Sequence, residues 1–199
     1  SVIPLVGNVK SMKLIAKKAW QSGLQISAAL LFVIALGTEA RSESLVSPFI
    51  DAEVPGAEPV GSGRFSVLFW DVYDATLFAP EGKWQANSPY ALSLTYLRDF
   101  DGEDIASRSV KEMRRQSGVS RADLDRWLPL MRDLFPDVTS GDTLTGVYLD
   151  NGSARFYLNG SLLGDIEAPG FASRFFAIWL GEQTSEPEFR NKLLAGVAK

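Results

Sequence analysis

Alternation of apolar and polar side chains marks one segment clearly as a β-strand. In residues 90–100, YALSLTYLRDF, the first, third, fifth and seventh positions are all Tyr or Leu. Successive side chains of a strand point to opposite faces, so this segment presents one strongly apolar face. Residues 67–80, VLFWDVYDATLFAP, are apolar at almost every position. This pattern predicts a strand covered on both faces, with Asp71 and Asp74 on opposite faces.

Apolar positions at helical spacing predict four helices, in two pairs. Glycine near the end of three of these segments suits a helix stop. The segments are 101–118, 120–136, 171–183 and 185–196.

Between the two pairs of helices, the sequence predicts three short strands joined by tight turns. The strands cover about 142–150, 153–158 and 161–166. Asn151-Gly152 and Asn159-Gly160 suit type I′ hairpin turns, because both turn residues need positive φ. The order of strands, two helices, a three-stranded meander and two helices predicts an α+β fold, with helices packed on one face of an antiparallel sheet.

The N-terminal 40 residues are typical of an extension and a secretory signal peptide. From Met12 the chain carries three lysines, then a 14-residue apolar run at 24–37, then small residues at Thr38 and Ala40. This is the order of a basic region, an apolar region and a cleavage site. A membrane anchor is the alternative, but a bilayer core needs about 20 apolar residues. We therefore expect export to the periplasm or the exterior, with no stable membrane anchor after cleavage.

The remaining chain divides at residue 60 in this interpretation. Residues 41–60 contain three prolines and no clear period, so they are predicted to form an extended leader. Residues 61–199 then form the folded domain.

Composition excludes several classes of chemistry. The sequence contains no cysteine and no histidine, which excludes a Ser-His-Asp triad, a cysteine nucleophile paired with histidine, and a zinc site of the usual type. The part after Ala40 has 16 Lys and Arg residues against 23 Asp and Glu residues, a net charge of −7. Without a basic cluster, nucleic-acid binding is not expected. No phosphate-binding loop is present, and neither a cofactor nor a metal is predicted.

Taken in order, several segments resemble the chalcone isomerase fold, in particular its bacterial chalcone isomerase-like branch. They are GSG at 61–63, VYDATLFAP at 72–80, LTYLRDFDGEDIASRSVKEM at 94–113, and FASRFFAIWLGEQTSEPEFRNKLL at 171–194. The resemblance implies an open-faced β-sandwich, with a large antiparallel sheet, a helical layer on one face and a ligand cleft between them. The family includes plant enzymes that close a chalcone into a flavanone, fatty-acid-binding relatives and non-catalytic relatives.

The family's catalytic positions are not matched in this sequence. The isomerases carry an arginine that holds a phenolate in a GxGxR segment. Here Arg64 comes one residue early, and Phe65 stands in its place. A shift of one residue turns a side chain to the opposite face unless a bulge corrects it.

Further departures lie in the strand predicted at 90–100 and along the helices. Aligned on the glycine of DFDGEDI, the family's cleft lysine and catalytic tyrosine become Tyr96 and Ile105. Its substrate-contacting asparagine becomes Glu112, and the polar residue before the C-terminal glycine becomes Ile178. No catalytic residue is therefore predicted.

Three residues are candidates for binding a ligand: Arg64 as an anchor for an anionic head group, Tyr73 as a hydroxyl in the cleft, and Tyr96 beside it. The favoured interpretation is an exported protein without isomerase activity that binds an apolar small molecule such as a fatty acid. Two alternatives stay open: an enzyme that uses Tyr73, Tyr96 or Glu112, and a partner-binding module with a filled cleft.

Overall fold

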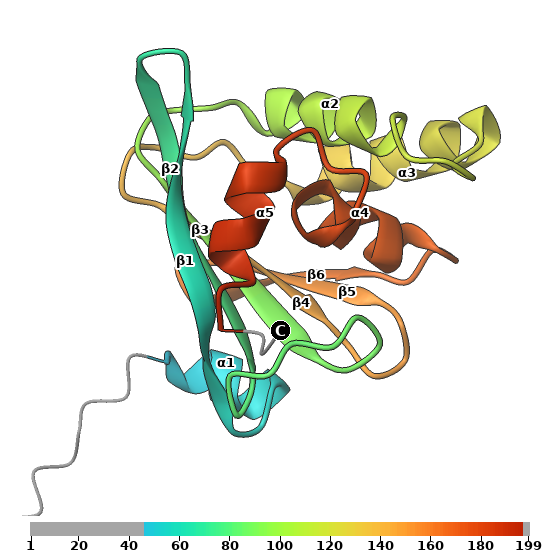
Figure 1. The fold of residues 1–199 in the computed structure, drawn as a ribbon. Coiled ribbons are helices and arrows are strands. Elements are labelled where there is room, and N and C mark those ends of the chain that lie inside the picture. Colours follow the sequence, from blue (N-terminus) through green and yellow to red (C-terminus); the bar gives the residue numbers. More distant parts are fainter. Residues whose placement is uncertain (1–45, 197–199) are drawn as a thin grey trace, which may run out of the picture. The chain divides into compact units, whose positions relative to one another are not determined.

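A computed structural model of the chain describes residues 46–196. Over this range, six strands form one antiparallel sheet in which spatial order follows chain order (Figure 1). The strands are β1 (Ala57–Val67), β2 (Trp70–Pro80), β3 (Tyr90–Tyr96), β4 (Thr143–Tyr148), β5 (Ala154–Leu158) and β6 (Ser161–Ile166). The helices are α1 (Pro48–Glu53), α2 (Gly102–Met113), α3 (Arg121–Leu134), α4 (Phe171–Leu180) and α5 (Pro187–Leu193). The predicted α+β class with an antiparallel sheet is confirmed.

The predicted meander is also confirmed, although only one of its turns has the predicted form. Asn159 and Gly160 have φ angles of 49° and 80°, as a type I′ turn requires. At the preceding turn Gly152 has positive φ but Asn151 does not. The side chain of Asn151 instead accepts a hydrogen bond from the backbone nitrogen of Ser153 at 3.0 Å, so this turn is stabilised by a side chain.

Helices α2, α3, α4 and α5 cover one face of the sheet (Figure 1). The apolar face of β3 points into this layer, and its four residues are buried: Tyr90, Leu92, Leu94 and Tyr96. They pack with Trp127, Phe156, Phe171 and Phe176, which are almost inaccessible to solvent. Burial of large apolar side chains from both layers forms the main core.

The other face of the sheet is mostly open, and α1 packs against part of it. Ile50 and Val54 lie in a second apolar cluster with Val147 and Tyr157 from the sheet. The predicted extended leader at 41–60 is therefore wrong beyond residue 47, because α1 and the first residues of β1 lie there. Six residues are too few to show a helical period, so the sequence pattern could not reveal α1.

The apolar run at 67–80 is not one strand. Leu68 and Phe69 form a two-residue turn, and Val67 pairs with Trp70 across it. The run thus contains the end of β1, the turn and β2. No Gly, Asn, Asp or Pro stands at the turn, so the residues that normally mark a hairpin are missing.

A bulge in β2 corrects a second expectation. Arg64 pairs with Asp74, but the next polar pair is Ser66 with Asp71, which leaves Val72 as an extra residue. The extra residue shifts the alternation by one position. Asp71 and Asp74 consequently lie on the same face, not on opposite faces as predicted.

Both edges of the sheet are irregular. β1 contains Pro59 and a register shift at Val60, whose carbonyl oxygen accepts a hydrogen bond from Gly196 N at 2.9 Å. α5 packs so closely on this strand that a Cβ on Gly61 would lie 2.3 Å from the carbonyl oxygen of Lys192. At the other edge, β6 has a register shift and a glycine with a φ of 150°, Gly164.

The predicted signal peptide lies outside the described residues. Within 46–196, no helix has the length and apolar character needed to cross a bilayer.

Candidate ligand-binding pocket

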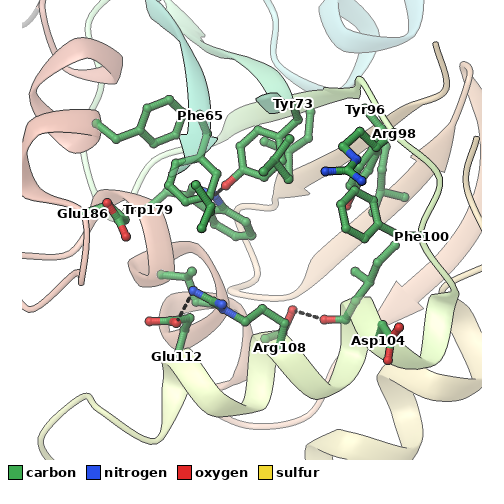
Figure 2. A pocket seen from close by; sticks show the side chains of 18 of the residues that line it. Phe65, Tyr73, Tyr96, Arg98, Phe100, Asp104, Arg108, Glu112, Trp179 and Glu186 are labelled. Carbon is green, nitrogen blue, oxygen red and sulfur yellow. Dashed lines mark hydrogen bonds and ion pairs between the residues drawn. The ribbon is translucent and has the colours of Figure 1, made fainter. Parts of the chain in front are cut away.

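A pocket with a volume of about 470 Å³ opens between the sheet and the helical layer. This volume lies within the range of about 300–1,000 Å³ that is common for small-molecule sites. Its walls come from β1, β2, β3, β4, α2, α4 and α5 (Figure 2). They are mainly apolar and include Phe65, Leu94, Leu144, Phe175, Ile178 and Phe189. An open volume of this size does not fit the alternative of a filled cleft.

Tyr73 of β2 supplies a hydroxyl group to the pocket wall. The ring stacks on Phe65 with centroids 5.1 Å apart, and its hydroxyl accepts a hydrogen bond from Trp179 Nε1 at 2.9 Å. Burial raises the pKa of Tyr73, so the phenol stays protonated at neutral pH. Within residues 46–196 its proton has no acceptor, so the hydroxyl is free to donate to a ligand.

Tyr96 of β3 lies directly opposite Tyr73 in the sheet register. Their rings meet edge to face with centroids 6.0 Å apart, and burial raises the pKa of Tyr96 as well. The structure thus brings two of the three predicted ligand-binding residues together on one wall of the pocket. That they contact a ligand stays a prediction.

Arg64, the third predicted residue, does not reach the pocket. Its Nε donates to Asp74 Oδ1 at 2.7 Å, and its Nη1 donates to Asp71 Oδ2 at 3.1 Å. Side chains alternate along β1, so Arg64 lies on the open face while its neighbour Phe65 lines the pocket. No bulge turns Arg64 inward, and its prediction as a cleft anchor is wrong.

A buried carboxylate from α2 lies at the helical wall. Glu112 is 8% exposed and receives a hydrogen bond from Ser185 Oγ at 2.9 Å. Arg108, one helical turn earlier, places its Nη2 2.9 Å from Glu112 Oε1 (Figure 2). These partners satisfy the carboxylate, in keeping with the high cost of an unpaired buried charge.

Arg98 lies at the exposed part of the pocket, just after β3. Its guanidinium carbon is 4.5 Å from the ring centroid of Trp70, a cation–π geometry. None of the carboxylates in residues 46–196 forms an ion pair with Arg98. Arg98 therefore keeps hydrogen-bond donors available beside the pocket.

The four positions that the sequence resemblance sets against polar cleft residues all line this pocket. They are Tyr96, Ile105, Glu112 and Ile178. Two of the four are isoleucines, which offer neither a proton nor a hydrogen bond. Within the described range, no cluster of three or more acidic side chains is arranged to hold a metal ion.

Residues 60–195 match the family described as chalcone isomerase-like. The chain belongs to the chalcone isomerase-like family. Among solved structures, it resembles a fatty-acid binding protein from Arabidopsis thaliana, with a TM-score of 0.58 and 14% sequence identity over 76% of this chain and 96% of that one. At this identity the likeness concerns the fold alone. A search of curated proteins found no match.

Sequence reasoning did not select three residues that shape the pocket. Arg98 follows Tyr96 by two positions, so strand alternation already placed both side chains on one face. Arg108 stands four residues before Glu112, the spacing of neighbours on a helix. Trp179 belongs to a very apolar helical segment, and its hydrogen bond to Tyr73 joins β2 to α4, which no local pattern reveals.

Proposed function

We propose that this member of the chalcone isomerase-like family binds an apolar small molecule with a polar end, such as a fatty acid, in the pocket beside Tyr73. The observation that carries the proposal is the open apolar pocket with a free hydroxyl proton at its wall. Apolar walls with a few polar groups are typical of sites for such ligands. The fatty-acid binding protein that shares the fold supports the same ligand class.

The polar end of the ligand would lie between Tyr73 and Arg108. The positive charge of Arg108 acts on Tyr73, where it favours the phenolate and partly opposes the effect of burial on the pKa. A carboxylate at this place would accept a hydrogen bond from the Tyr73 hydroxyl and face the guanidinium of Arg108. Hydrogen bonds between charged partners are the stronger ones in proteins.

A second ligand class is favoured by the charges around the pocket. Four carboxylates line it, those of Asp99, Asp104, Glu112 and Glu186, against the two guanidinium groups of Arg98 and Arg108. Because Glu112 already occupies part of Arg108, a fatty acid has to compete for this cation. An uncharged long-chain alcohol would use the Tyr73 hydroxyl without this repulsion.

Calorimetric titration with decanoic acid and 1-decanol distinguishes the two classes. For the acid, we expect Tyr73→Phe to weaken binding about 10- to 150-fold, from about 1.5–3 kcal/mol for a hydrogen bond to a charged group. Glu112→Gln should strengthen acid binding and leave alcohol binding unchanged, since it removes the competing charge. Tyr148→Phe is a matched control, because Tyr148 does not line the pocket.

Tighter binding of the alcohol than of the acid in the unmodified protein would assign the pocket to uncharged ligands. Binding of neither compound would refute the proposal.

We further propose that the protein acts after export. The apolar run at 24–37 and the small residues that follow support this proposal. N-terminal sequencing of protein from its host tests this, and a chain uncut near Ala40 would contradict it.

A further inference from the structure

The tip of the β1–β2 hairpin exposes an unusual set of side chains to solvent. Val67, Leu68, Phe69 and Trp70 are 44%, 87%, 97% and 61% exposed. They are consecutive, and the hairpin extends past the helical layer (Figure 1). Single exposed apolar residues are ordinary on a protein surface, but four together at a protruding turn indicate a contact site.

The turn keeps these residues at a conformational cost. Leu68 has a φ of 57°, while Phe69 is not in the positive range. A two-residue turn with positive φ at its first position strongly prefers glycine there. Leucine in this conformation is strained, and such strain is concentrated at functional sites.

The exposed tip is continuous with the pocket. Val67, Leu68 and Trp70 line the pocket as well as the surface, whereas Phe69 does not line it. An apolar ligand leaving the pocket past the tip would therefore meet apolar side chains throughout. Beside them, Arg98 stacks on Trp70 and has no carboxylate partner in residues 46–196.

We propose that the hairpin tip docks on a lipid surface, with Leu68 and Phe69 inserted among the acyl chains and Trp70 and Arg98 at the level of the head groups. Tryptophan is enriched at membrane interfaces, and the guanidinium of arginine binds phosphate well. This inference rests on the proposed function, because the same surface would then be the source or destination of the apolar ligand.

A second copy of the chain is the other conceivable partner, and the size of the tip argues against it. Stable protein interfaces use about 20–30 residues on each side, far more than this turn presents. Insertion into lipid has no such minimum, because each apolar side chain contributes separately to binding. Around the tip, the carboxylates of Asp71, Asp74 and Asp99 outnumber the guanidinium groups of Arg64 and Arg98, so docking should occur on zwitterionic lipids without help from anionic ones.

A single fluorescent label can test the docking directly, because the chain has no cysteine. We would attach an environment-sensitive dye to Phe69→Cys in the full chain and add phosphatidylcholine vesicles that carry a quencher in the acyl region. Ala86→Cys is the matched control, since it is exposed in the loop between β2 and β3, at the other end of β2. We expect quenching at position 69 and none at position 86.

If residues 1–45 bound the vesicles instead, both labelled variants would bind to the membrane, but the dye at position 69 would stay in water and would not be quenched. That result would overturn the proposal. A change in the fluorescence of the dye at position 69 that occurs without vesicles and depends on protein concentration would assign the tip to a second copy of the chain. That result would also overturn the proposal.

The variant Phe69→Ser separates this inference from ligand binding. Because Phe69 does not line the pocket, the affinity of this variant for a soluble ligand such as decanoic acid should be unchanged. Its transfer of ligand to vesicles should slow about tenfold or more, the effect of losing one inserted aromatic side chain. Leu162→Ser is the control, since Leu162 is 59% exposed on β6. Equal transfer rates in both variants and the unmodified protein would refute docking while leaving the proposed function intact.

Discussion

The two faces of the sheet both carry polar side chains, but they use them differently. On the open face these groups bind one another. Arg64 pairs with Asp71 and Asp74, and the hydroxyls of Ser93 and Thr145 lie 2.8 Å apart. On the covered face, Tyr73 and Arg98 keep hydrogen-bonding capacity that no group in residues 46–196 uses.

This difference indicates which polar groups stabilise the fold and which are available to bind a ligand. A group that is fully paired within the protein has little left to offer a ligand, whereas a buried donor without an acceptor costs free energy unless something binds it. Arg64 has the type of side chain that suits an anion site, yet its pairing makes it a structural residue. The spare donors of the covered face are therefore the better guide to function.

The largest effect that we expect from this difference between the faces is a loss of stability at alkaline pH. Burial raises the pKa of Tyr73, Tyr90 and Tyr96 on the covered face. Above pH 10 the unfolded chain loses these protons and the folded chain holds them, so the free energy of unfolding falls as pH rises. By pH 11 three tyrosines amount to about 4 kcal/mol. Urea unfolding at pH 8, 10 and 11 measures this loss.

Tyr90→Phe is the control for this prediction. It should reduce the dependence on pH by the share of one tyrosine, about 1.4 kcal/mol at pH 11. Stability that stays constant from pH 8 to pH 11 would show that the phenols of the covered face titrate normally.

The next effect in size concerns the open face alone. Arg155 donates to both oxygens of Asp165 at 2.8 Å and to Glu53 of α1 at 2.9 Å. Arg155→Met leaves two partly buried carboxylates without a cation and should lower the free energy of unfolding by about 1.5–3 kcal/mol. Ligand affinity should not change, because Arg155 is not among the residues that line the pocket. Paired urea unfolding and ligand titration check both parts, and weaker ligand binding would break the separation between the faces.

Arg64→Ala is the matched control and should have a smaller effect. Its ion pairs are more exposed than those of Arg155, and exposed pairs contribute little. The hydrogen bond from Arg64 lowers the pKa of Asp74. This contribution is therefore present at neutral pH and is lost in acid, as the pH falls below the ordinary aspartate value and through the lowered pKa.

The sequence predicted the parts of the fold that follow from local periodicity. The alternation in 90–100 predicted β3 and its buried face, because one face of this strand is apolar throughout, and the Asn159-Gly160 dipeptide predicted the turn between β5 and β6. The β1–β2 hairpin was missed because its turn lacks any turn-forming residue. The bulge at Val72 also reversed the predicted face of Asp71, since an extra residue puts the side chains before it and after it out of step.

The candidate site was predictable only in part, for a related reason. Tyr73 and Tyr96 were selected from strands whose alternation held at those positions. Arg64 was selected for its chemistry, but its partners lie across the hairpin on the face that the bulge determined. Contacts such as that between Trp179 and Tyr73 join residues 106 positions apart and arise only from tertiary packing.

The irregular edges of the sheet have a consequence for the behaviour of the chain in a crowded compartment. An open sheet normally offers its outer backbone groups to strands of other chains, which is a route to aggregation. Here Pro59 lacks a donor, the carbonyl of Val60 is already bound by Gly196, and α5 packs on the strand. The register shift in β6 disturbs the other edge. The sheet is thus protected from growing by strand addition at either end, and a protein that lost α5 would regain an edge on which copies could polymerise.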